Sequence, residues 1–168
     1  MRILVLGLGN DFYGDDGVGL EAVRMLEREW AEAAFAKGTN WAVEFEACPL
    51  TGLALLDVVA GFDALVVIDT VRRPDPATGR IRVLGAEDLR DVPGPSPHYV
   101  SIPQTLAIGR GLGLRMPERI KIIAVEAKNL YRLGEGLTAE MRGALPEIVA
   151  AARGILENWP AVLRDTCP

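Results

Sequence analysis

Cysteine and histidine are scarce in this chain, which has two cysteines, Cys48 and Cys167, and one histidine, His98. The two cysteines have neither the spacing of a zinc site nor that of a redox motif, and this usage is typical of the reducing cytoplasm. A disulfide between Cys48 and Cys167 is the less favoured alternative in that compartment. We therefore expect a cytoplasmic protein.

Long apolar runs and clusters of basic residues are also missing. No apolar run approaches the roughly 18 residues that a membrane-spanning helix needs. The apolar start has no basic segment and no small-residue cleavage site, so we do not expect a signal peptide. The net charge is −5 and only Lys121 and Lys128 follow Lys37, whereas nucleic acid binding needs clustered Lys and Arg. We expect binding to neither membranes nor nucleic acid.

Strand and helix patterns alternate along the 168 residues, which predicts an α/β fold. We expect a three-layer α/β/α sandwich around a mostly parallel, five-stranded sheet with one antiparallel strand. One domain should span residues 1–158, followed by a C-terminal tail over residues 159–168. The expected strands cover residues 3–6, 41–48, 65–68, 80–84 and 119–125, and the expected helices cover residues 17–34, 51–59, 101–111 and 138–159.

Several local features refine this pattern. The alternation at residues 80–84 predicts a short hairpin or an edge strand, and a hairpin would make this strand antiparallel to the one before it. Thr51 and Thr138 are predicted to cap the helices that follow them. Pro146 should kink the last helix or split it. Leu20 falls among the polar residues of its helix and is interpreted as a scattered surface leucine.

Acidic residues stand where two apolar strands end. Asp15 and Asp16 follow the first strand, and Asp69 ends the strand at residues 65–68. The carboxyl ends of neighbouring parallel strands meet at one edge of the sheet, which is the usual place of active sites in open α/β sheets. His98 ends a loop stiffened by Pro93, Pro95 and Pro97, and we expect this loop to return to the same edge.

The three groups Asp16 (or Asp15), Asp69 and His98 allow more than one chemistry. Two carboxylates and an imidazole suit a borderline cation such as Zn²⁺ or Ni²⁺. The same groups could perform metal-free acid–base catalysis, with a proton shared between the carboxylates. Taken singly, each aspartate could also be a turn or cap residue and the histidine a surface residue. The residues alone leave these interpretations open.

The glycines of the first loop resemble a dinucleotide fingerprint only in part. Gly7-Leu8-Gly9 starts like the G-x-G-x-x-G pattern, but Phe12 stands at the third glycine position. The acids that follow would repel a pyrophosphate rather than bind it. Nucleotide binding is therefore disfavoured.

The order of the motifs resembles the hydrogenase maturation endopeptidases. GLGN and GDDGVG follow the first strand, VVIDT ends a later one, SPH lies in the proline-rich loop and VEAKNLYRLGEGLT precedes the last helix. The resemblance extends from Arg2 to about Leu156. It implies that a C-terminal peptide is removed from a nickel-loaded [NiFe]-hydrogenase large-subunit precursor. It also implies that Asp16, Asp69 and His98 contact the nickel, which the substrate carries, and that Asp16 and Asp69 serve in cleavage.

The chain departs from the family pattern at two places. Cys48-Pro49-Leu50 precede Thr51-Gly52 where relatives often have an acid and glycines, and Tyr99 follows His98 where relatives commonly have Gln or Glu. These departures concern a further carboxylate and the choice of precursor. The partner implied is the large-subunit precursor, with the enzyme acting as a monomer. The competing functions are a non-catalytic nickel-sensing chaperone and a metal-free aspartic-type hydrolase on the same fold.

Overall fold

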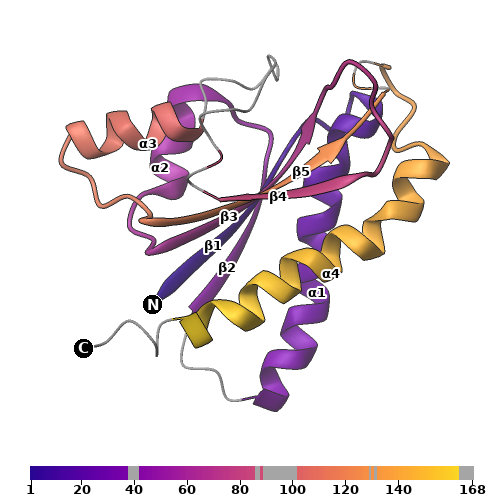
Figure 1. Cartoon of the computed structure of the whole chain (residues 1–168). Helices are drawn as coiled ribbons and strands as arrows, with labels where there is room; N and C mark the ends of the chain where they lie inside the picture. Colours follow the sequence, from indigo (N-terminus) through magenta and orange to yellow (C-terminus); the bar gives the residue numbers. More distant parts are fainter. Residues whose placement is uncertain (38–41, 86–87, 89–101, 129, 131, 163–168) are drawn as a thin grey trace.

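The computed structural model describes the chain except residues 38–41, 86–87, 89–101, 129, 131 and 163–168 (Figure 1). Its centre is a five-stranded sheet in the order β2-β1-β3-β5-β4. The first four strands in this order are parallel, and β4 is antiparallel to β5. The predicted fold class is therefore confirmed. The strands are β1 (Arg2–Leu8), β2 (Ala42–Cys48), β3 (Ala64–Val71), β4 (Ile81–Gly85) and β5 (Arg119–Glu126).

The hairpin predicted between β3 and β4 is wrong, whereas the alternative of an edge strand and the antiparallel direction are confirmed. β4 pairs with β5 through the register Ile81↔Val125 to Gly85↔Lys121, and β5 lies between β4 and β3. The physical reason is that β5 is a more apolar strand than β4. Its Ile123 and Val125 are 0% exposed and need a neighbour on each side, whereas Val83 of β4 is 48% exposed, as suits an edge.

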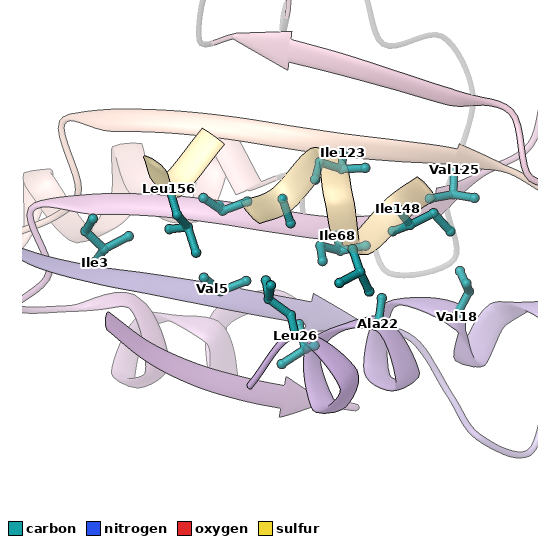
Figure 2. Packing of buried hydrophobic residues seen from close by; sticks show 14 of the residues in the cluster. Ile3, Val5, Val18, Ala22, Leu26, Ile68, Ile123, Val125, Ile148 and Leu156 are labelled. Atoms are coloured by element: carbon teal, nitrogen blue, oxygen red, sulfur yellow. The ribbon is translucent and has the colours of Figure 1, made fainter. Parts of the chain in front are cut away.

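Helices cover both faces of the sheet (Figure 1). The helices α1 (Val18–Lys37) and α4 (Ala139–Val162) cover one face, while α2 (Leu55–Val59) and α3 (Ile102–Gly111) cover the other. Alternate residues of β1 and β3 face the two layers, as the pleat of a strand requires. Ile3, Val5, Val66 and Ile68 belong to the core under α1 and α4 (Figure 2), and Leu4, Leu6, Leu65 and Val67 to the core under α2 and α3. β1 and β3 are thus buried on both faces, as their sequences predict.

The helix boundaries follow the predicted ones with some differences. A short 3-10 helix η1 (Gly14–Gly17) leads into α1, and another, η2 (Gly52–Ala54), leads into α2. Leu20 is 2% exposed, so its interpretation as a surface leucine is wrong. The helical period identifies only the stripe that faces the sheet, and the amino end of α1 is covered by further contacts outside that stripe.

The two predicted N-caps have opposite outcomes. The Thr138 hydroxyl accepts a hydrogen bond from the Met141 backbone N–H at 3.2 Å and caps α4, as predicted. Thr51 makes no such bond, and the prediction of a cap there is wrong. The helix α4 is continuous through Pro146 and runs to Val162, so the predicted split does not occur. Its buried face, which includes Met141 and Ile148, keeps the helix packed on the sheet despite the missing N–H.

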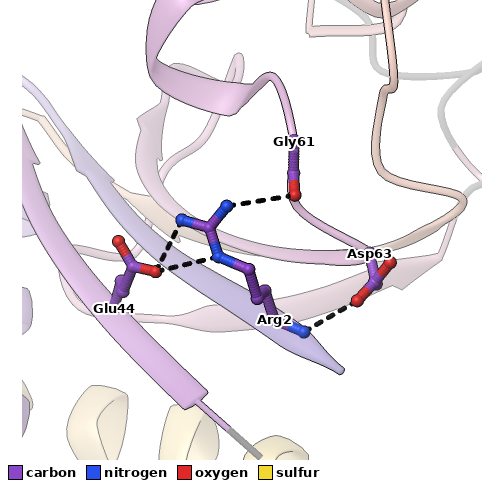
Figure 3. Close-up of polar contacts among 4 residues, drawn as sticks. All are labelled: Arg2, Glu44, Gly61 and Asp63. Atoms are coloured by element: carbon purple, nitrogen blue, oxygen red, sulfur yellow. Dashed lines mark hydrogen bonds and ion pairs between the residues drawn. The ribbon is translucent and has the colours of Figure 1, made fainter.

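A polar network closes the amino edge of the sheet (Figure 3). The Arg2 guanidinium donates to Glu44 Oε1 from Nη2 at 2.8 Å and from Nε at 3.2 Å. The backbone N–H of Arg2 donates to Asp63 Oδ2 at 2.7 Å, and Arg115 forms an ion pair with the same carboxylate. The bond from the Arg2 backbone, together with the Arg115 charge, holds the pKa of Asp63 below its usual value of 3.8.

In the part of the chain that the structure describes, no helix is long and apolar enough to span a membrane.

This network makes part of the stability pH-dependent. Asp63→Asn should lower the free energy of unfolding at pH 7 by about 1 kcal/mol, the usual scale for such bonds. The pKa of Asp63 is lower in the folded state than in the unfolded one, so its stabilisation is complete above the unfolded value and is lost as the pH falls through the folded value. Urea unfolding at pH 7 and at about pH 3 measures this effect. The difference in the free energy of unfolding between Asp63→Asn and wild type should be smaller at the acid pH.

The control for this experiment is Asp75→Asn, which changes an exposed carboxylate in the loop before β4. It should change the stability little at either pH. A difference between Asp63→Asn and wild type that stays constant across the acid range would show that the Asp63 pKa is not lowered by folding.

Candidate functional site

Asp69 lies near the carboxyl end of β3 and is half-buried. Its Oδ1 accepts a hydrogen bond from the backbone N–H of Thr70 at 2.8 Å, so the side chain folds back on the next residue. Alternation along β3 directs Asp69 toward the side of the sheet that α2 and α3 cover, where Leu65 and Val67 also point. The strand thus fixes both the place and the direction of this carboxylate.

Asp16 reaches the same place from the neighbouring strand. It lies in η1, directly after β1, and is 1% exposed. Its Oδ1 accepts a hydrogen bond at 2.9 Å from the hydroxyl of Thr70, which is itself 2% exposed. β1 and β3 are parallel neighbours, so the predicted meeting of the two strand exits is confirmed. Both predicted carboxylates bond to one residue, Thr70.

Asp15, the adjacent acid, has a different environment. It is 0% exposed, and its Oδ1 accepts from the Thr138 backbone N–H at 2.7 Å while its Oδ2 accepts from the Thr138 hydroxyl at 3.1 Å. The sequence predicts that Asp15 supports the start of its own helix. The structure shows that it ties η1 to the start of α4, 123 residues away in the chain. Asp15 is therefore a structural residue, whereas Asp16 bonds to Thr70, the residue that follows Asp69 in β3.

Close backbone packing explains the glycines of the first loop. A Cβ on Gly7 would lie 2.1 Å from the Gly19 carbonyl oxygen, and one on Gly9 would lie 2.0 Å from that of Asp16. A Cβ on Gly19 would lie 2.2 Å from the Leu8 carbonyl oxygen. Gly9 also has a φ of 147°, which favours glycine. The glycines let η1 and the amino end of α1 lie directly on β1, and this contact sets the position of Asp16.

His98 lies outside the described residues, as do Tyr99 and the proline-rich loop that carries them. Among the residues that the structure describes, no group of three or more His, Cys, Asp or Glu side chains could hold a metal ion. The carboxylates of Asp16 and Asp69 are the described part of the predicted ligand set. The joint site with His98 stays a prediction.

Glu126 is a carboxylate that the sequence reasoning did not single out. It ends β5 and is 1% exposed; its Oε2 accepts the Ala77 backbone N–H at 3.0 Å and lies 3.7 Å from an Arg80 guanidinium nitrogen. Its Oε1 lies 4.0 Å from Arg73 Nε. It holds the loop of residues 72–80, which directly follows the strand of Asp69. An acid at the end of a buried strand, the signal used for Asp69, would have found it.

Cys48 is a free, buried thiol at the end of β2. Burial raises its pKa, which disfavours the reactive thiolate. Cys167 lies outside the described residues.

The chain was compared with known proteins. No family model matches it. It is 29% identical over 162 residues to the hydrogenase expression/formation protein HupD of Rhizobium leguminosarum bv. viciae, covering 94% of this chain and 75% of HupD. It is 28% identical over 158 residues to the hydrogenase 2 maturation protease of Escherichia coli (strain K12), covering 91% of this chain and 92% of that one. The chain is similar to hydrogenase maturation proteases over more than nine-tenths of its length. The predicted resemblance is therefore confirmed.

The fold comparison agrees with this assignment. The solved structure of the hydrogenase maturating endopeptidase HybD from Escherichia coli superposes with a TM-score of 0.72 over 94% of each chain. Their sequences are 23% identical, so this match concerns the fold. The similarity to hydrogenase maturation proteases identifies the protein as a hydrolase of the endopeptidase class.

Proposed function

We propose that this protein removes a C-terminal peptide from the nickel-loaded precursor of a [NiFe]-hydrogenase large subunit, acting as a monomer in the cytoplasm. One observation carries the proposal. Asp16 and Asp69, from neighbouring strand exits, are held by the same residue at the carboxyl edge of the sheet. This edge is where open α/β folds place their active sites.

The side chains of Asp16, Asp69 and His98 suit the nickel ion that such a precursor would carry. Carboxylate oxygens and an imidazole nitrogen are good ligands for a borderline divalent cation such as Ni²⁺. In the proposal, Asp16, Asp69 and His98 sense nickel held in the precursor by completing its coordination. A precursor without nickel would not be fixed in place, which makes cleavage depend on prior metal insertion.

Cleavage needs a water molecule that is polarised by the metal or activated by a carboxylate. The two acids differ in their access to that water. Asp16 is 1% exposed, whereas Asp69 is half-buried. Asp69 is therefore the better placed of the two to accept a proton from the attacking water, and Asp16 is the better shielded ligand.

The test is incubation of the protein with a purified nickel-loaded precursor, followed by intact-mass spectrometry. The expected result is a loss of mass equal to a C-terminal peptide, with no loss from precursor that lacks nickel. A stable complex without a change in mass would replace the proposal with a nickel-sensing chaperone. Cleavage that persists in His98→Ala and does not depend on nickel would replace it with a metal-free aspartic-type hydrolase.

A further inference from the structure

Thr70 bonds to both proposed carboxylates. Asp69 precedes it in β3, and Asp16 lies in η1. Its backbone N–H donates to Asp69 Oδ1 at 2.8 Å and its hydroxyl donates to Asp16 Oδ1 at 2.9 Å. A hydroxyl has a single proton to donate, and here that proton goes to Asp16. Thr70 thus links η1, which follows the first strand, to the strand that carries Asp69.

The surroundings make this link rigid. Thr70 is 2% exposed and Asp16 is 1% exposed, so water does not compete well for the bond between them. Threonine is branched at Cβ, which restricts rotation about its first side-chain torsion and so fixes the direction of the hydroxyl. The backbone N–H is fixed in turn by its place in β3. Each carboxylate therefore has one oxygen held by Thr70, which sets the direction of the other.

We propose that Thr70 is a positioning residue for cleavage, which holds Asp16 and Asp69 in the mutual orientation that the nickel-bearing end of the precursor requires. This inference rests on the proposed function. Thr70 is buried and bonds to both acids, so it does not need to contact the precursor itself. It acts through the carboxylates, so its loss should slow the chemical step more than it weakens docking of the precursor.

The experiment compares Thr70→Val, Thr70→Ser and wild type in precursor cleavage, with kcat and KM measured separately. Valine keeps the shape and removes the donor, whereas serine keeps the donor. Thr70→Val should lower kcat about 10- to 100-fold, the usual cost of losing a group that orients a ligand or catalytic residue. KM should change less than kcat, because both carboxylates remain available to bind the nickel and only their orientation is altered. Thr70→Ser should recover most of the lost rate.

The matched control is Thr105→Val in α3. Thr105 is 1% exposed, and its hydroxyl donates a long bond, 3.5 Å, to the Gly52 carbonyl oxygen. This variant loses a buried hydroxyl that does not contact Asp16 or Asp69, and it should cleave like wild type. If Thr105→Val lost as much rate as Thr70→Val, the loss would be a general effect of replacing a buried threonine by valine. That result would overturn the inference.

A second measurement does not depend on cleavage. The Thr70→Val and Asp16→Ala substitutions each remove the hydrogen bond between these two side chains, so their effects on the urea midpoint should be non-additive in the double variant. The positioning role would be overturned if Thr70→Val had the kcat of wild type, or if Thr70→Ser did not recover the lost rate. In either case, cleavage by Asp16→Asn would still test the proposed site itself. If the wild type itself does not cleave the precursor, the proposed function fails, and the inference fails with it.

Discussion

Asp16→Asn should abolish cleavage of the nickel-loaded precursor while the protein stays folded. Loss of a residue that acts directly in catalysis commonly costs about a thousandfold or more in kcat. Asparagine has the same shape as aspartate, and its oxygen can still accept the Thr70 hydroxyl bond that Asp16 accepts at 2.9 Å. The fold should therefore change little, while the negative charge that binds the metal or accepts a proton is gone. Mass spectrometry of the precursor measures the rate, and circular dichroism measures the folded fraction.

Asp15→Asn is the matched control, one residue away in the chain. Both carboxylate oxygens of Asp15 accept bonds from Thr138, at 2.7 and 3.1 Å, and asparagine has only one acceptor oxygen. One buried bond is lost, so the free energy of unfolding should fall by about 1–3 kcal/mol. Cleavage per folded molecule should stay close to that of wild type. If Asp15→Asn stops cleavage in a folded protein and Asp16→Asn does not, the roles of the two acids are reversed.

Asp69→Asn and His98→Ala complete the comparison in the same assay. Each should leave the protein folded and stop processing, since both residues belong to the predicted ligand set. Normal cleavage by two of the three variants at Asp16, Asp69 and His98 would contradict the proposed site.

The positions of the acids could be predicted because they depend on strand order. An apolar strand followed by an acid identifies a strand exit, and parallel neighbours bring two exits together. The residue pattern by itself could not separate the roles of Asp15 and Asp16, and only the resemblance to a known family favoured Asp16 as the metal contact. That distinction depends on bonds to Thr138 and Thr70, which lie 123 and 54 residues away in the chain. No local pattern reports contacts over such separations.

The same limit explains the error in the sheet. The strand β4 has the alternation of an edge strand and the right direction, but the sequence does not show which strand lies beside it. A later strand, β5, takes the place next to β3 because it can bury Ile123 and Val125 there. The burial of Leu20 was missed for a related reason. The periodicity of a helix predicts which residues face the sheet, but it does not show which other segments cover the rest of the helix.

Gly19→Ala should be the most damaging small substitution in the scaffold of this site. A Cβ at Gly19 would lie 2.2 Å from the Leu8 carbonyl oxygen and 2.5 Å from that of Ile68. Both atoms are backbone, one in β1 and one in β3, so neither can move without disturbing the sheet. Overpacking of this kind costs about 1–3 kcal/mol and occasionally more, and we expect a loss of at least about 3 kcal/mol because two strands are affected. Urea unfolding measures it.

Gly143→Ala is the control, since it makes the same chemical change in a helix where space is available. No heavy atom lies within 4 Å of a Cβ built at Gly143, which is exposed on α4. Alanine should raise the free energy of unfolding by about 0.5–1 kcal/mol there, because glycine is the poorer helix former. Equal effects of the two variants would contradict the close approach at Gly19.

The Gly19 variant also tests how the scaffold serves the site. An alanine there must push the amino end of α1 away from the sheet, and η1 with Asp16 moves with it. Asp69 stays on β3, so the bond from Thr70 to Asp16 should weaken while the one to Asp69 remains. Cleavage per folded molecule should therefore fall in Gly19→Ala and not in Gly143→Ala. If the folded molecules of Gly19→Ala cleaved the precursor as fast as wild type, the glycines would serve stability alone. Cleavage would then tolerate a displacement of Asp16.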